Sequence, residues 1–153
     1  MRSTTIEDGL AAGAVAAVLS GAPSTLHALA TRSSPLEATL AAGSLLLPRE
    51  RRALALVLAA VPVHLALSLG WAILLAAVLP RRRTATWGIL ASLAIAALDL
   101  GVVGRRHPRI RALALMPQVL DHVAFGATVG AVLSARRRSR AWRPAGRARA
   151  PAA

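Results

Sequence analysis

Four long runs of the chain carry almost no charge, and this pattern limits the possible folds more than any other feature. The runs cover about residues 9–30, 53–79, 84–103 and 112–135, and the only charged residues inside them are Asp99 and Asp121. A helix of about 20 apolar residues crosses roughly 30 Å of hydrocarbon. A soluble helix would show a charged face, which these runs lack. The sequence therefore predicts an all-α fold, an integral membrane bundle of four transmembrane helices.

The first run is the least apolar and allows an alternative interpretation. A cleaved signal peptide could end at "HALA", residues 27–30. However, Glu7 and Asp8 precede the run, where a signal peptide carries positive charge. We therefore expect a membrane span. The chain has no cysteine, which excludes disulfides, thiolate metal sites and cysteine nucleophiles.

Two segments outside the runs have distinct compositions. Residues 36–47, between Pro35 and Pro48, are mostly apolar but too short to span, so we expect an interfacial helix or a re-entrant half-helix. Residues 136–153 are basic and rich in Ala, Pro and Gly. We predict a disordered cytoplasmic tail there, beside a membrane domain of residues 1–135. Anchoring of this tail to anionic lipid is a simpler role than binding to nucleic acid.

The arginines between the runs predict how the chain sits in the membrane. Four crossings put both termini on one side, which then carries eleven arginines against eight on the other. Cytoplasmic loops of membrane proteins carry an excess of positive charge. We therefore expect the N- and C-termini to be cytoplasmic.

Small residues recur at a spacing of four along every run. Such ridges let helix backbones approach closely in lipid, although an alanine-rich chain also produces them by chance. The ridges are Gly9, Gly13, Ala17 and Gly21; His64, Ser68, Ala72 and Ala76; Gly88, Ser92 and Ala96; and His122, Gly126, Gly130 and Ser134.

A count of depth predicts where the polar residues of the runs meet. His64 lies 11 residues into the second run, and Asp121 and His122 lie nine and ten residues into the fourth. If the spans alternate, all three are roughly 14–16 Å below the same face. Ser20 has a similar depth, and Ser68 is one turn deeper. We predict a polar core for a proton or a ligand, consisting of Ser20, His64, Ser68, Asp121 and His122.

Asp121 needs a partner, because a carboxylate at mid-membrane costs about 2.5–3.5 kcal/mol on insertion scales. His64 is the expected partner across the bundle. Together with His122, these two residues could also bind a metal ion, since Zn and similar ions accept histidine and carboxylate ligands together.

Asp99 belongs to a second, shallower layer in this count. It lies four residues before the end of the third run, roughly 6 Å deep. Thr25 and His27 fall near that level. We expect Arg105 or Arg106 to reach back along the helix and pair with Asp99.

Three short motifs resemble those of a known family. "HLALS" at 64–68, "WG" at 87–88 and an acid beside a histidine in the fourth run are similar to landmarks of the YagU-like family of small four-span bacterial inner-membrane proteins. The resemblance covers spans two to four. The outer loops are shorter here, and the family has a wider gap between the acid and the histidine. The resemblance implies a four-span fold in the bacterial cytoplasmic membrane, but no chemistry.

Three classes of function fit these features. The chain could be a structural or accessory membrane component, with a second copy or another membrane protein as its partner. It could be a small transporter, proton relay or sensor that uses His64, Asp121 and His122. It could also bind a metal ion or haem between His64 and His122. An enzyme is the least supported class, since only the spacing of His64 and Ser68 hints at a nucleophile. No pattern identifies a substrate or a cofactor.

Overall fold

The computed structural model describes residues 3–142, and every regular element in this range is a helix. Four helical segments are long and apolar enough to cross a membrane, which confirms the predicted fold class and identifies a membrane protein. These segments are Ser3–Ala30, Ala53–Val78, Thr84–Arg106 and Leu115–Ala141.

Two of the four spans are irregular. The first consists of α1 (Ser3–Leu19) and α2 (Ala22–Ala30), with a break between them. The third begins as α5 (Thr84–Leu98) and continues through a π-helical turn, η1 (Asp99–Val103), and a 3-10 turn, η2 (Gly104–Arg106). The second and fourth spans are the single helices α4 (Ala53–Val78) and α7 (Leu115–Ala141).

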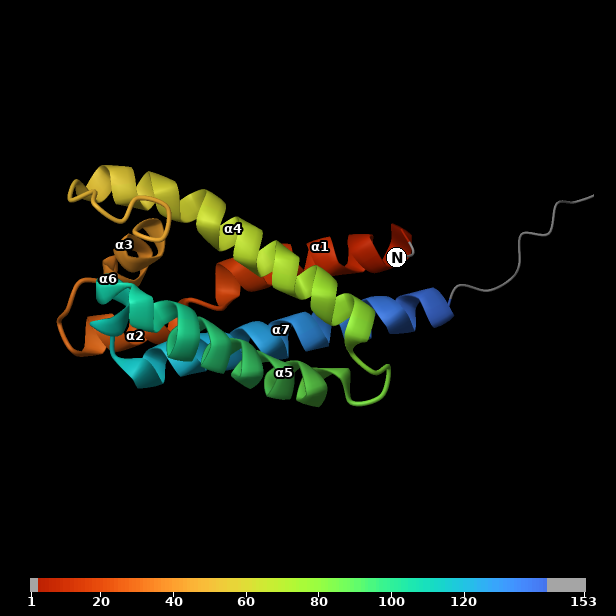
Figure 1. Cartoon of the computed structure of the whole chain (residues 1–153). Coiled ribbons are helices and arrows are strands. Elements are labelled where there is room, and N and C mark those ends of the chain that lie inside the picture. Colours follow the sequence, from red (N-terminus) through yellow and green to blue (C-terminus); the bar gives the residue numbers. More distant parts are fainter. Residues whose placement is uncertain (1–2, 143–153) are drawn as a thin grey trace, which may run out of the picture.

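The four spans form an open row. Helix α7 packs against α5 on one side and against α1 and α2 on the other, whereas α1 packs against α4. Helix α4 contacts α7 only sparsely, through its last turns, where the two helices cross in Figure 1. The broken span and α7 are therefore the two central members of the row.

Two short helices lie at one end of the molecule, where the second span begins. Helix α3 (Glu37–Gly43) packs on the first turns of α4 and contacts α6 (Pro108–Arg111), as seen in Figure 1. Gly43 lies directly against the backbone carbonyl of Leu56, where no side chain would fit. Segment 36–47 thus covers the first turns of α4. Its interfacial or re-entrant character stays a prediction.

The predicted ridges of small residues meet at the α1–α4 interface. A methyl group at Gly13 would lie 2.9 Å from the Ser68 carbonyl oxygen and 3.0 Å from the Ala72 side chain. A methyl group at Gly9 would lie 2.5 Å from the Cα atom of Ile73. The glycines of α1 therefore bring the two backbones into contact.

The same pattern holds the α5–α7 interface together. A methyl group at Gly126 would collide with the Gly88 carbonyl and with the Ser92 side chain. One at Gly130 would lie 2.5 Å from the Cα atom of Ala85. The prediction that spacing-four ridges are packing surfaces is confirmed at both interfaces. Close packing is the main attraction available in lipid, because lipid tails are as apolar as the side chains.

Arginines at the end of α7 join three chain segments, a feature that the sequence analysis did not predict. Arg136 and Arg140 both contact the Asp8 carboxylate near the start of α1, and the Arg140 contact is 2.9 Å long. Asp8 is buried, with 6% of its surface exposed. Arg140 also lies 3.6 Å from the Glu7 carboxylate. We call Arg136, Arg137 and Arg140 the arginine clasp.

Arg137 binds the end of α4. Its guanidinium donates to the carbonyl oxygens of Ala76, Leu79 and Pro80 at 3.1–3.2 Å. The last carbonyls of a helix lack partners within the helix, so this arginine acts as a cap supplied by another span.

The predicted boundary of the tail at residue 136 is wrong. Helix α7 continues to Ala141, because acids and helix carbonyls hold the arginines that follow residue 135. The rest of the predicted tail, from residue 143 on, lies outside the described residues.

Candidate functional site

The break in the first span exposes two sets of backbone groups in the middle of the span. Helix α1 ends at Leu19 and α2 begins at Ala22, with a turn at residues 20–21 between them. Pro23 has no N–H group, so it cannot donate to the carbonyl one turn earlier. The carbonyl end of α1 and the N–H end of α2 therefore need partners from elsewhere.

His64 binds the carbonyl end of the break. Its Nε2 lies 2.8 Å from the Ala17 carbonyl oxygen. Because a carbonyl only accepts, this ring nitrogen carries the proton and donates it. Helix α4 thus supplies a donor to the end of α1, where the helix dipole is negative.

Asp121 binds the N–H end of the break from the opposite side. Its Oδ1 accepts the backbone N–H of Ser24 at 2.9 Å. Ser24 belongs to the first turn of α2, whose N–H groups have no partner within the helix. A carboxylate is the favoured group at the positive end of a helix dipole. Asp121 is therefore an N-cap that α7 supplies to α2.

The expected pairing of His64 with Asp121 is wrong. Within residues 3–142, no hydrogen bond or ion pair joins them, although both bind the same break. The reason is that the break offers each of them a backbone partner of complementary polarity. Depths of side chains alone predicted the pairing, whereas the partners are two backbone groups, the Ala17 carbonyl and the Ser24 N–H.

His122 contacts Asp99, which the sequence analysis assigned to another layer. The Nδ1 of His122 donates to the Gln118 carbonyl at 2.8 Å, and its Nε2 lies 3.5 Å from Asp99 Oδ2. Since Nδ1 already carries a proton, a bond to Asp99 needs one further proton, placed on Nε2 or on the carboxyl group. The pair can therefore hold one proton between η1 and α7.

The assignment of Asp99 to a separate, shallower layer is therefore wrong, and the cause lies in the span boundaries. The third span continues to Arg106 and the fourth begins at Leu115. Asp99 lies seven residues before the first of these ends and His122 seven residues after the second, so their depths match. Neither Arg105 nor Arg106 forms a salt bridge with Asp99 in the described chain. Asp99 is instead the first residue of the π-helical turn η1, a feature frequent at functional sites.

The other predicted residues surround the break without forming further bonds between spans. Ser20 is buried within the break, and Ser68 is buried against Gly13. The Thr25 hydroxyl donates to the Gly21 carbonyl at 2.8 Å. His27 lines a small cavity of about 80 Å³, together with Ser24 and Gln118 among other residues. This volume is large enough for several water molecules beside Ser24 and Gln118, the partners of Asp121 and His122.

The predicted metal set is not assembled. His64, Asp121 and His122 each bind a different partner, namely Ala17, Ser24 and Gln118 with Asp99. In the part of the chain that the structure describes, no group of three His, Cys, Asp or Glu side chains could hold a metal ion. Haem between His64 and His122 would also need α4 and α7 to face each other at that level, whereas the broken first span lies between them.

Comparisons of the chain with protein-family models, with curated proteins and with solved structures found no match. The site therefore has to be interpreted from its own geometry.

Proposed function

We propose that the protein is a structural or accessory component of the membrane, in which the intramembrane ionisable residues hold a broken span in a fixed register. The observation that carries this proposal is the pair of bonds across the break, from His64 to Ala17 and from Ser24 to Asp121. Each side chain matches the polarity of the helix end that it meets. A ligand site would leave such groups open toward a cavity.

The energetics of the bilayer support a structural use. An unsatisfied backbone group in hydrocarbon costs several kcal/mol, so a break in a span persists only where protein satisfies its ends. Hydrogen bonds between spans average about 0.6 kcal/mol, which specifies a partner more than it stabilises one. His64 and Asp121 thus determine where α4 and α7 sit relative to the break.

Replacement of Asp121 tests this proposal. Asp121→Asn keeps an oxygen acceptor for the Ser24 N–H, so we expect the thermal unfolding midpoint in detergent to stay near that of the wild type. Asp121→Leu leaves this N–H without a partner and should cost about 1–3 kcal/mol. If both variants unfold like the wild type, Asp121 does not hold the break. If Asn is as damaging as Leu, the charge is essential in some other way.

A proton-handling role is the second candidate, and the Asp99–His122 pair favours it. The two groups share a site for one proton, and their side chains retain 27% and 20% exposure. Proton uptake by the protein in liposomes, with Asp99→Asn as the comparison, tests this role. Uptake that disappears in Asp99→Asn while the unfolding midpoint is unchanged would support proton handling over the structural role.

The location of the chain and its partners in the membrane belong to the same proposal. We infer that the chain resides in a bacterial cytoplasmic membrane with both termini on the cytoplasmic side, as the arginine balance and the YagU-like motifs predict. An accessory role implies a partner within the membrane, either a second copy or another membrane protein. The basic segment after residue 135 would add contacts with anionic lipid.

A further inference from the structure

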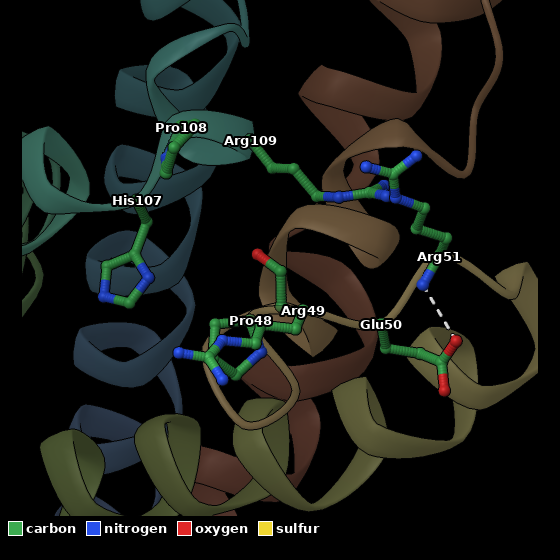
Figure 2. Close-up of a pocket in the computed structure, with 8 residues that line it drawn as sticks. Pro48, Arg49, Glu50, Arg51, His107, Pro108 and Arg109 are labelled. Atoms are coloured by element: carbon green, nitrogen blue, oxygen red, sulfur yellow. Dashed lines mark hydrogen bonds between the residues drawn. The ribbon is translucent and has the colours of Figure 1, made fainter.

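A basic cavity lies at the end of the molecule that carries α3 and α6, away from the polar residues at the break. Its volume is about 400 Å³. One wall is the loop that precedes α4, with Pro48, Arg49 and Arg51, and the other is the start of α6, with His107 and Arg109 (Figure 2). Two loops that are distant in sequence thus enclose one concave surface.

The positive charge of this cavity is not neutralised by protein. Glu50 is the only acidic residue in its lining, and its carboxylate binds Arg52 at 2.9 Å. The backbone N–H groups of Arg51 and Arg52 also donate to it, at 2.8 Å each. Within residues 3–142, none of Arg49, Arg51 and Arg109 forms a salt bridge.

Glu50 stays ionised and committed to Arg52 over the whole physiological range. The hydrogen bond from the Arg52 guanidinium, with those from the two backbone N–H groups, lowers the pKa of Glu50 from 4.5 to about 2. The carboxylate therefore does not turn toward the cavity when the pH changes. Three guanidinium groups remain to be balanced by something other than protein.

The arrangement of the arginines concentrates this charge. In Figure 2, the Arg51 and Arg109 side chains extend toward each other from the two walls, and no carboxylate lies between them. Guanidinium groups that line one cavity repel each other, so an anion bound between the two walls would stabilise them. Arginine forks bind phosphate oxygens in a bidentate manner.

The position of the cavity relative to the spans indicates which anion can reach it. Arg51 and Arg52 immediately precede the span that begins at Ala53, and His107 immediately follows the span that ends at Arg106. Both walls therefore lie at the level of the lipid headgroups. Basic pockets in such positions bind anionic headgroups.

We propose that this cavity binds a phosphate-bearing anion, with the headgroup of an anionic phospholipid as its natural source. Arg51 and Arg109 hold the phosphate between them, and Arg49 and His107, one on each wall, complete the basic lining. The volume lies within the range of about 300–1,000 Å³ that small-molecule sites occupy, so a glycerol phosphate group fits.

Binding of short-chain lipids to the full-length protein in neutral detergent tests the proposal. The ligands are a phosphatidylglycerol, a phosphatidylcholine of the same chain length and inorganic phosphate, each titrated and followed by native mass spectrometry. The test variant is Arg51→Gln with Arg109→Gln. The control is Arg105→Gln with Arg111→Gln, which removes the same charge from exposed positions on the same face.

We expect the test variant to bind phosphatidylglycerol at least about tenfold more weakly than the wild type, because charge-assisted hydrogen bonds are lost. The control should bind within about twofold of the wild type, since its arginines contribute only to the general field. Arg51→Lys with Arg109→Lys should recover part of the affinity. Recovery in the lysine variant would show that the glutamine variant lost charge at the site and not its fold.

The three ligands distinguish the source of the phosphate. Competition by inorganic phosphate would assign the site to a free anion, whereas binding of phosphatidylglycerol alone would assign it to a lipid headgroup. Either result supports a phosphate site. Equal binding of phosphatidylcholine, no binding of any ligand, unchanged affinity in the glutamine variant, or an equal loss in the control would overturn it.

Discussion

His122 occupies a position in which only one of its two neutral tautomers fits. Its Nδ1 faces the Gln118 carbonyl at 2.8 Å, and a carbonyl accepts but never donates. The proton on this nitrogen is therefore fixed by the backbone of α7. Any proton exchange with Asp99 takes place at Nε2, which lies 3.5 Å from the carboxylate.

Nitrogen-15 NMR of labelled histidine in detergent micelles checks this assignment. We expect the His122 Nδ1 to remain protonated between about pH 5 and 8, with any titration confined to Nε2. Asp99→Asn should shift the Nε2 resonance and leave the Nδ1 resonance nearly unchanged. A neutral His122 protonated only at Nε2 would contradict the contact with Gln118.

The interfaces between helices depend on the absence of single methyl groups. Gly126 and Gly88 approach so closely that each carbonyl occupies the space of the other residue's side chain. In lipid this contact replaces the hydrophobic driving force that joins helices in water.

Gly126→Ala should therefore destabilise the α5–α7 pair by about 1–3 kcal/mol, since the backbone has to move apart. Gly70→Ala is the matched control, because open space surrounds Gly70 on the face of α4. Thermal unfolding in detergent measures both. A Gly126→Ala variant as stable as the Gly70→Ala variant would mean that the two helices are not in backbone contact.

The arginine clasp acts at the ends of helices. Arg137 donates to three carbonyls at the end of α4, whereas its neighbour Arg138 is exposed and forms no side-chain hydrogen bond among residues 3–142. We expect Arg137→Met to lower the free energy of unfolding by about 1–3 kcal/mol, since buried acceptors lose their donor. Arg138→Met should have little effect. Equal effects of the two substitutions on denaturation would show that the clasp contributes only charge.

The sequence predicted the spans and the packing ridges because both depend on side chains. Hydrocarbon excludes charge, so the runs without charge are the spans. Contact between backbones requires small residues, so ridges such as Gly88 with Ser92 mark the interfaces. The ends of the spans were less predictable, because an arginine was taken as the end of a helix. Residues 136–141 remain helical since α1 and α4 supply partners for their guanidinium groups.

The hydrogen-bond partners of His64 and Asp121 were harder to predict from the sequence. Depth counts brought His64 and Asp121 toward the same level, and the structure places both at the break. Their partners are the Ala17 carbonyl and the Ser24 N–H, which are backbone groups that every residue possesses. Pro23 signals only that the Leu19 carbonyl loses its donor, and it does not say where the helix breaks or which span will bind the ends.

At the scale of the whole molecule, different contacts hold the four spans together at the two ends of the molecule. The arginine clasp joins α7 to α1 and α4 where α1 begins and α7 ends, and α3 and α6 cover the opposite end (Figure 1). The two central members of the row meet between these ends, at the break. This arrangement requires four crossings, with loop residue Ser34 and clasp neighbour Ser139 on opposite sides of the membrane.

Cysteine labelling in intact cells tests this topology, because the chain has no cysteine of its own. Ser34→Cys and Ser139→Cys introduce single thiols at exposed positions. A membrane-impermeant maleimide should label Ser34→Cys from outside, and Ser139→Cys only after the cells are opened. Labelling of both from the same side would contradict four crossings, and the reverse order would place the termini outside.

The central claim is that Asp121 caps the second half of the broken span, and hydrogen exchange at the Ser24 amide measures this bond most directly. In the wild type and in Asp121→Asn, we expect this amide to be protected, since Oδ1 accepts its hydrogen. In Asp121→Leu, its exchange should accelerate by about tenfold or more. The neighbouring Thr25 amide, which donates to Gly21 within the same span, should keep its protection. An unchanged exchange rate at Ser24 in Asp121→Leu would contradict the account.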